Sequence, residues 1–292
     1  MRGRIIKGVG GLYSVFCCGE AMLCKARGRF RNQNLRPEVG DEVEFTPPSA
    51  GEDYGTINTI LPRQNRMTRP SVVNIGLLFV IVSVKDPEPD LMLADKLLLH
   101  ARQMGIEAEL LVNKSDAADP ESILTQYRLS GYRPLAVSAA NAQGLEELLY
   151  RIRDKVCAFC GQSGVGKSSV LNALCRNVRM ETGDISRIAR GRHTTRHVEL
   201  IRLEAAGNAW LADTPGFSLL EADVCKPSEF RQWYPEYEPY EKDCRFLGCN
   251  HVEEPDCAVK QAVSDNLLSA ERRERYARLY RENNEKWSRR YD

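Results

Sequence analysis

Gly161-Gln162-Ser163-Gly164-Val165-Gly166-Lys167-Ser168 follows an apolar run at 156–160 and precedes a helix-like segment at 169–174. The pattern G-x-x-x-x-G-K-[ST] between a buried strand and a helix is typical of a phosphate-binding loop, although a Gly/Ser turn is the simpler alternative. Inward-pointing backbone N–H groups and the positive end of the helix would bind polyphosphate. Lys167 would contact the outer phosphates and Ser168 would ligate Mg²⁺. The other loop residues expected to bind nucleotide are Gly161, Ser163, Gly164, Val165, Gly166 and Ser169.

A second motif lies upstream, where an apparent strand at 109–112 runs into Asn113-Lys114-Ser115-Asp116, an N-K-x-D sequence. The Asp116 carboxylate can accept from both the N1–H and the exocyclic amine of guanine. Adenine would instead present an unpaired acceptor to it. Asn113 and Lys114 would brace the loop and cover the base. For so short a motif, a simple turn after a strand is the alternative. The presence of a phosphate loop in the same chain favours guanine recognition.

Two shorter elements follow other apparent strands. Ser138-Ala139 comes after residues 135–137 and could offer a backbone N–H to the guanine carbonyl. Asp213-Thr214-Pro215-Gly216 comes after residues 210–212 and matches D-x-x-G. In that motif Asp213 would hold Mg²⁺ through water, and the Gly216 N–H would contact the terminal phosphate.

The polar segment 179–197 is interpreted as a nucleotide-dependent switch. A threonine hydroxyl here would complete the magnesium shell; Thr195 is preferred and Thr194 is the alternative. Phe217 follows the D-x-x-G, where Ras-like GTPases have a water-orienting glutamine, so we expect slow intrinsic hydrolysis. His193 is the candidate for positioning that water, and a surface histidine is the alternative. The predicted catalytic set is His193, Lys167 and Thr195, and Arg190 or Arg192 could be an internal arginine finger or an RNA contact.

The order of these motifs is informative. Ras-like GTPases begin with the phosphate loop, whereas here the N-K-x-D and the Ser-Ala element precede it. The same parallel sheet is therefore predicted in circularly permuted form, which is tolerated where chain ends are close and exposed. As a consequence, the second switch runs directly into the C-terminal part of the chain.

Length and composition limit the possible classes of protein. The 292 residues suggest two or three domains, and the net charge of +1 excludes a generally basic nucleic-acid binder. No apolar run approaches membrane-spanning length, so we expect a cytoplasmic protein with no membrane partner. Ten cysteines in such a compartment indicate reduced thiols and a metal site rather than disulfides.

Residues 1–70 contain short strand-like runs separated by turn signals, which predict a small OB-type β-barrel that binds RNA. Basic residues gather beside Phe30, suited to phosphate and base-stacking contacts, although a solvated strand face explains them equally well. The basic residues are Arg27, Arg29, Arg31 and Arg36, and the following linker adds Arg63, Arg66 and Arg69.

Residues 71–222 alternate between apparent strands and helices and form the predicted α/β GTPase domain. Cys157 and Cys160 in the strand before the phosphate loop are interpreted as core thiols. Residues 223–292 carry Cys244, Cys249, His251 and Cys257, a tetrahedral ligand set for one structural Zn²⁺ in a small helical domain. The charged helix near 269–290 could be a solvated face or a second RNA contact.

The combination and order of these motifs resemble the ribosome small-subunit-dependent GTPase A family (RsgA/YjeQ type) along nearly the whole chain. That resemblance implies GTP and GDP as ligands, Mg²⁺ and a partnership with the small ribosomal subunit and its rRNA. It also implies GTP hydrolysis on the subunit late in its maturation, followed by dissociation. We expect a monomer that does not bind DNA. One alternative is a GTP-regulated RNA-binding chaperone or scaffold with incidental hydrolysis, and a P-loop ATPase is disfavoured by the N-K-x-D. Family members often have a third threonine where this chain has Arg196.

Overall fold

The computed structural model describes residues 1–28, 30, 35–68, 70–182, 198–213 and 223–291; for 177–182, 205 and 291 only the backbone is described. The chain divides into two compact units, and each is described by itself. The first comprises residues 1–78, 147–159 and 174–219, and the second comprises 79–146, 160–173 and 220–292. Within the described residues, no helix has the length and apolar character needed to cross a bilayer.

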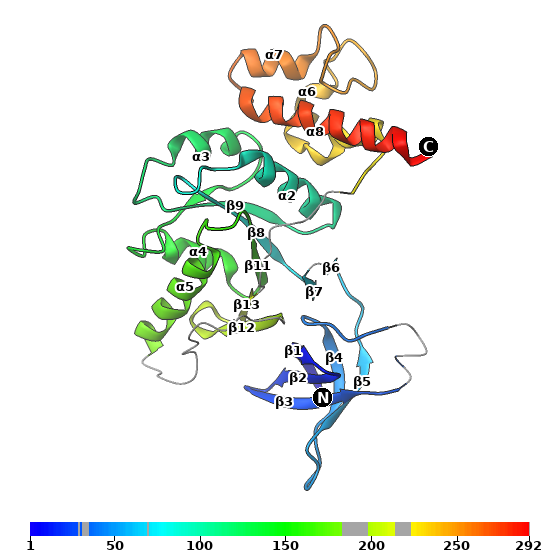
Figure 1. Cartoon of the computed structure of the whole chain (residues 1–292), viewed down its shortest axis with the longest axis vertical. Coiled ribbons are helices and arrows are strands. Elements are labelled where there is room, and N and C mark those ends of the chain that lie inside the picture. Colours follow the sequence, from blue (N-terminus) through cyan, green and yellow to red (C-terminus); the bar gives the residue numbers. More distant parts are fainter. Residues whose placement is uncertain (29, 31–34, 69, 183–197, 214–222, 292) are drawn as a thin grey trace. The chain divides into compact units, whose positions relative to one another are not determined.

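The first unit contains a closed five-stranded barrel, drawn in blue in Figure 1. Its strands pair in the order β1-β2-β3-β5-β4 and β4 returns to β1, with β3 and β5 parallel. Alternate side chains such as Ile5, Val15, Val43 and Ile57 fill the interior. This confirms the predicted OB-type barrel. The bounds are β1 Arg2–Val9, β2 Leu12–Cys17, β3 Glu20–Ala26, β4 Glu42–Thr46 and β5 Gly55–Ile60.

A three-stranded part of the GTPase sheet belongs to the same unit. In it β13 (Ala209–Asp213) pairs in parallel with β11 (Val156–Cys160) and antiparallel with β12 (Glu199–Leu203). All of β11 is buried, which confirms that Cys157 and Cys160 are core thiols. β12 also pairs with β1 of the barrel. The remaining elements are the hairpin β6 (Arg66–Thr68) and β7 (Ser71–Val73), α4 (Leu145–Ile152) and η1 (Glu204–Ala206).

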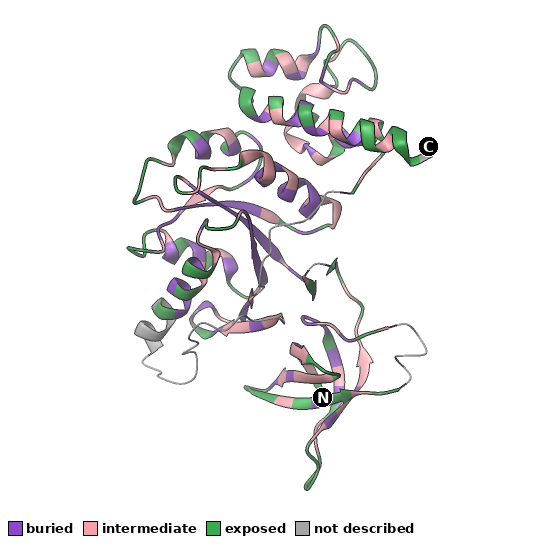
Figure 2. Ribbon diagram, viewed as in Figure 1, coloured by how far each residue is buried: buried purple, intermediate pink, exposed green. Residues whose placement is uncertain are grey.

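The second unit carries the alternating strands and helices expected for the nucleotide-binding fold. β9 (Ala108–Asn113) pairs in parallel with β10 (Leu135–Ala136). Every residue of β8 (Leu77–Ser83) is buried, as the purple ribbon in Figure 2 shows, in agreement with a sheet covered on both faces. α2 (Leu91–Gln103) begins where the Asp90 carboxylate accepts from the Leu93 N–H. The other helix of this unit is α3 (Glu121–Arg128), and α5 (Lys167–Thr182) begins in this unit and ends in the first.

The C-terminal helices also belong to the second unit. Their core contains the stacked and edge-on rings of Phe230, Tyr234, Tyr237 and Tyr276, and Leu99 of α2 packs into the same cluster. α2 therefore shares a hydrophobic core with the C-terminal segment. The elements are η2 Pro227–Trp233, η3 Pro235–Tyr237, α6 Glu238–Glu241, α7 Ala258–Ser264, α8 Ala270–Ser288 and η4 Arg289–Tyr291.

One expectation for the C-terminal helix holds only in part. Arginines on the outside of α8, as a solvated face or an RNA contact, agree with the exposed Arg278 and Arg281, but the expectation is wrong for Arg272 and Arg275. Arg272 is only 4% exposed, and its guanidinium contacts both Asp95 of α2 and Glu236. Arg275 also donates to Asp95, with an Nε–Oδ2 distance of 2.5 Å. A buried charge needs a counter-charge, so these two arginines join elements of the protein rather than face a partner.

Candidate functional site

The phosphate loop lies between β11 and α5, the context that its sequence predicts. Gly161 has a φ of 137°, and a Cβ there would approach the Ile81 carbonyl oxygen to 2.1 Å. At Gly166 the φ is 95°, and a Cβ would lie 2.4 Å from Asn113 Nδ2. Both positions therefore require glycine, for conformation and for space. Ser163, Gly164, Ser168 and Ser169 are exposed, and Val165 is buried.

Lys167 stands at the start of α5 and turns back across the loop. Its Nζ donates to the carbonyls of Gly161 and Gln162, both at 2.8 Å. Burial lowers the pKa of this lysine, because removal from water disfavours the ammonium. A polyphosphate in the loop would supply the negative charge that compensates this desolvation.

The N-K-x-D segment contacts the phosphate loop directly. Asn113 is the last residue of β9; its Nδ2 donates to the Val165 carbonyl at 2.8 Å, and its Oδ1 accepts from the Ala139 N–H at 3.3 Å. Lys114 has a φ of 62°, and its Nζ donates to the carbonyl of Gly164 at 3.1 Å and to that of Asp86. Both residues thus hold the N-K-x-D segment, residues 113–116 and hereafter the base loop, against the phosphate loop.

Asp116 presents its carboxylate at the surface beside the Ser-Ala element. Ser138 is fully buried and donates its hydroxyl to Asp116 Oδ1. The Ser138 oxygen also accepts from the Asn141 N–H at 3.3 Å. The Ser138 hydroxyl thus holds one oxygen of the Asp116 carboxylate and restricts the orientation of that side chain. The structure therefore brings together Asn113, Lys114, Asp116, Ser138, Ala139 and the phosphate loop.

Asp213 is the final residue of β13 and is partly buried. β13 runs parallel to β11, the strand that leads into the phosphate loop, so the two strands end at the same edge. The other switch residues predicted from sequence lie outside the described residues: His193, Thr194, Thr195, Gly216 and Phe217.

The four predicted zinc ligands converge in the C-terminal segment. The ligand atoms of Cys244, Cys249, His251 and Cys257 all lie within 4.8 Å of one another. His251 Nδ1 is 3.4 Å from Cys257 Sγ and 3.7 Å from Cys244 Sγ. Zinc with bonds of about 2.3 Å to sulfur and about 2.0 Å to nitrogen separates tetrahedral ligands by similar distances. The donor set and its spacing fit Zn²⁺.

A further residue orients the histidine of this cluster. His251 Nε2 lies 3.3 Å from Glu241 Oε1 of α6, which leaves Nδ1 to face the three sulfurs. Burial lowers the pKa of His251, partly opposed by the Glu241 carboxylate, and so favours the neutral ring that a metal needs. Glu241 cannot be recognised from sequence, because only the fold of residues 238–251 brings its carboxylate to the histidine ring.

Comparisons with known proteins agree with this geometry. The family described as RsgA GTPase matches residues 60–223, and the one described as RsgA N-terminal domain matches residues 2–57. The chain belongs to the RsgA GTPase family. As a member of that family it is a GTP hydrolase that uses a guanine nucleotide, as the base loop and phosphate loop indicate.

Several relatives match the RsgA-family chain over nearly its full length. Two are named small ribosomal subunit biogenesis GTPase RsgA. The one from Caldanaerobacter subterraneus subsp. tengcongensis is 40% identical, and the alignment covers 100% of this chain and 98% of the relative. The one from Alkaliphilus metalliredigens is 41% identical, with 95% of this chain and 96% of the relative covered.

Two solved structures share the fold of this RsgA-family chain. YjeQ from Thermotoga maritima has a TM-score of 0.81 and 33% identity, with 97% of this chain and 98% of that one covered. YloQ, described as a circularly permuted GTPase, has a TM-score of 0.80 and 31% identity, with 98% of this chain and 95% of YloQ covered. The permuted fold inferred from the motif order is therefore confirmed.

The barrel surface of this RsgA-family protein differs from the expectation at two residues. Phe30 is 4% exposed and belongs to the barrel core, so its ring is not available for base stacking. Arg63 donates from Nε to Asp41 Oδ1 at 2.7 Å and from a terminal nitrogen to the Arg36 carbonyl at 2.6 Å. It therefore ties barrel loops together instead of facing a partner.

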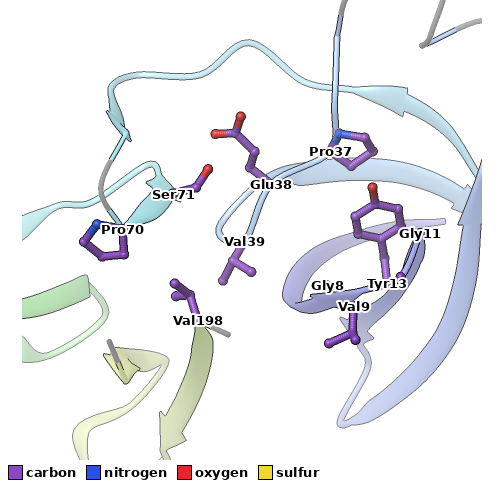
Figure 3. Close-up of a pocket in the computed structure, with 11 residues that line it drawn as sticks. Gly8, Val9, Gly11, Tyr13, Pro37, Glu38, Val39, Pro70, Ser71 and Val198 are labelled. Carbon is purple, nitrogen blue, oxygen red and sulfur yellow. The ribbon is translucent and has the colours of Figure 1, made fainter. Parts of the chain in front are cut away.

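A different aromatic residue lies near the exposed arginines. Tyr13 of β2 is partly buried and lines a cavity of about 500 Å³ with Pro37, Glu38 and Val198 (Figure 3). It also lines an adjoining cavity of about 780 Å³ together with Arg27 and Arg36. Sequence alone does not single out Tyr13, because the alternation in β2 fits either face of the barrel.

Proposed function

We propose that this RsgA-family GTPase binds the small ribosomal subunit, assists its late maturation, hydrolyses GTP when the subunit stimulates it, and then dissociates. The observation that carries the guanine switch is the bond from Asn113 Nδ2 to the Val165 carbonyl, which couples the base loop to the phosphate loop. The names of the relatives support the ribosomal part. The protein would act in the cytoplasm, as a monomer, with the subunit and its rRNA as partners and without DNA.

We assign the roles within three domains. Residues 1–70 would form the RNA-binding barrel, residues 71–222 the GTPase domain and residues 223–292 the zinc domain. Lys167 and the loop N–H groups would bind the phosphates. Asn113, Lys114, Asp116, Ser138 and Ala139 would bind guanine. Ser168, Thr195 and Asp213 would hold Mg²⁺, which would neutralise charge on the phosphates.

Contact with RNA would use the barrel face around Tyr13. Its half-buried ring can stack with a base while Arg27 and Arg36, both exposed, pair with phosphates. A basic patch with only two arginines is consistent with a protein whose net charge is only +1.

Hydrolysis would depend on groups that the subunit organises. Phe217 cannot orient water as a glutamine does, so the intrinsic rate would be slow. His193 would position the water once subunit binding orders the switch. Gly216 would contact the terminal phosphate and so link hydrolysis to the segment that leads into the zinc domain.

A second route from nucleotide to zinc domain runs through α2. Lys114 Nζ donates to the Asp86 carbonyl, and the Ser83 hydroxyl donates to the Pro87 carbonyl at 2.7 Å just before α2. α2 in turn shares Leu99 and the Asp95 ion pairs with the C-terminal helices. Movement of the base loop would therefore reach the zinc domain through packed elements.

A GTP-regulated RNA chaperone or scaffold is the second candidate, and Phe217 is the observation that favours it. A slow GTPase can act as a timed binder without repeated turnover. The two candidates differ in one property: whether subunit-bound protein turns over many GTP molecules.

Binding and release can be tested by sedimenting the protein with purified small subunits. We expect binding with a non-hydrolysable GTP analogue and loss of most of that binding with GDP. His193→Ala should bind with the analogue but fail to release after GTP addition. Equal binding in both nucleotide states would contradict the proposed cycle, and normal release by His193→Ala would contradict the role of that histidine.

A further inference from the structure

Two adjacent cysteines lie at the tight turn between β2 and β3 of the barrel, the first at the end of β2 and the second in the turn itself. Cys17 pairs with Glu20, and the two residues between them, Cys18 and Gly19, have φ values of 54° and 92°. A two-residue hairpin with positive φ at both positions favours Asn-Gly, because Asn and Gly tolerate this conformation. A cysteine in the first position is unusual, and such outliers often mark a functional site.

The two sulfur atoms of this turn are in contact. Cys17 Sγ lies 3.3 Å from Cys18 Sγ. Cys18 is exposed, whereas Cys17 is only 8% exposed. The ten cysteines all lie in the described part of the chain, and Cys18 is the one that is exposed there. Solutes can therefore reach the Cys18 sulfur, and the buried Cys17 sulfur lies next to it.

The surroundings leave room for a small reagent. A cavity of about 300 Å³ beside the turn is lined by both cysteines and by Arg4, Phe16 and Trp210. The hydrogen bond to Cys18, followed by burial, raises the pKa of the Cys17 thiol. Cys18 is exposed and Cys17 is buried, so the outer sulfur is the one that a small solute reaches first.

We propose that Cys17 and Cys18 are a reversible redox modification site that hydrogen peroxide converts to a disulfide between adjacent residues. The Cys18 thiolate attacks one peroxide oxygen; the O–O bond breaks, and hydroxide leaves and takes up a proton. The Cys17 sulfur then attacks the Cys18 sulfenic acid; the S–S bond forms, the S–O bond breaks and water leaves. Overall, two thiols are oxidised by two electrons and one peroxide is reduced to two waters.

The geometry also explains why this modification is reversible. Adjacent Cα atoms are about 3.8 Å apart, which is shorter than the roughly 4.4–6.8 Å of ordinary disulfides, so the product is strained. Strained and exposed disulfides are reduced readily by thiol–disulfide exchange. A protein dithiol or dithiothreitol would reopen the bond and become oxidised itself.

The test uses the full-length, zinc-loaded protein. It is treated with hydrogen peroxide, denatured, alkylated, and cleaved after Lys, Arg and Glu. Fragment 8–20 contains Cys17 and Cys18 and no other cysteine. Before oxidation, we expect this fragment to carry two alkyl groups. After oxidation, we expect it to carry none and to have the mass of the unalkylated dithiol fragment minus two hydrogens. Dithiothreitol should restore both alkyl groups.

Matched variants separate this reaction from others. Cys18→Asn keeps a residue suited to the turn, so we expect normal folding and GTPase activity, with Cys17 still alkylated after peroxide. Phenylarsine oxide, which bridges two thiols, should remain bound to the wild type after a monothiol wash and should wash off Cys17→Ser. Two alkyl groups on the oxidised wild-type fragment, a stable sulfinic acid at Cys18 or a disulfide to another fragment would each overturn the proposal.

Discussion

Arg272 of α8 and Asp95 of α2 form a buried ion pair that joins the C-terminal helices to the nucleotide-binding elements of the same unit. The Asp95 carboxylate is fully buried and also accepts from the Tyr127 hydroxyl at 2.8 Å and from Arg275. Arg272 completes its contacts with Glu236 at 2.7 Å. The charges compensate one another, so the loss of one partner would leave a buried charge unpaired.

Arg272→Met should therefore destabilise the protein strongly. We expect a loss of about 3–5 kcal/mol, because Asp95 and Glu236 would lose the guanidinium buried between them. The matched control is Arg281→Met on the same helix, whose ion pair with Glu253 is exposed on both sides and should contribute less than about 1 kcal/mol. Urea unfolding followed by fluorescence measures both. Equal effects of the two substitutions would refute the structural role of the buried pair.

Asp116→Asn should change base preference. An amide in place of the carboxylate can donate to the O2 carbonyl of xanthine but cannot accept both guanine donors. We expect GTP binding to weaken by about 10²-fold or more, as the loss of roughly 3 kcal/mol of charged hydrogen bonding implies, and xanthosine triphosphate to become the better ligand. Competition binding measures the ratio, with Asp119→Asn as a nearby exposed control. Retained guanine selectivity would show that Asp116 does not read the base.

The zinc site makes a prediction about metal content. The wild-type protein should hold one Zn²⁺ per chain. Cys257→Ser should lose the metal and destabilise the C-terminal helices, because the three remaining ligands bind Zn²⁺ more weakly than four do. Cys225→Ser removes a half-buried thiol outside the cluster and should retain the metal. Glu241→Gln should weaken zinc binding by about 10–100-fold through the orientation of His251. Metal analysis and chelator competition measure these differences, and zinc retained by Cys257→Ser would exclude that ligand.

His100 of α2 should make stability depend on pH. It is 8% exposed, and burial lowers its pKa below the ordinary value of 6.5, although Asp223 partly opposes this. The unfolded chain therefore binds a proton before the folded one does, and stability should fall as the pH drops below 6.5 toward the folded-state pKa. His100→Gln should remove up to about 1.4 kcal/mol per pH unit of that slope. Unfolding midpoints at pH 7.5 and 5.5 measure it; an unchanged slope would contradict the burial effect.

Local patterns predicted most of the nucleotide-binding elements. In the sequence, the continuous apolar run is 77–84 and the helical spacing is 91–104, each within one residue of the bounds of β8 and α2. Burial on both faces of a sheet and amphipathic spacing leave such direct marks in sequence. The OB-type barrel followed from turn signals and alternation. β1 was missed, because its residues, with Arg2, Arg4 and Lys7 among them, do not alternate cleanly.

Long-range polar contacts were not predictable in the same way. Asp95 and Arg272 are 177 positions apart, and each looks like an ordinary charged residue on a surface helix. Phe30 seemed exposed because arginines surround it in sequence, yet the barrel core contains it. Patterns report the periodicity of one element, whereas these contacts depend on how two elements pack. The bracing role of Asn113 was predicted in kind, but its partner Val165 was visible only in the fold.

We propose that this RsgA-family GTPase is guanine-specific and is stimulated by the small ribosomal subunit. Steady-state hydrolysis of GTP and of ATP, each with and without purified small subunits, tests it most directly. We predict slow GTP turnover alone, a strong increase and multiple turnovers with subunits, and no ATP hydrolysis in either case. GTP turnover that is indifferent to subunits would contradict the account and favour the scaffold alternative, and comparable ATP hydrolysis would contradict the base-binding site itself.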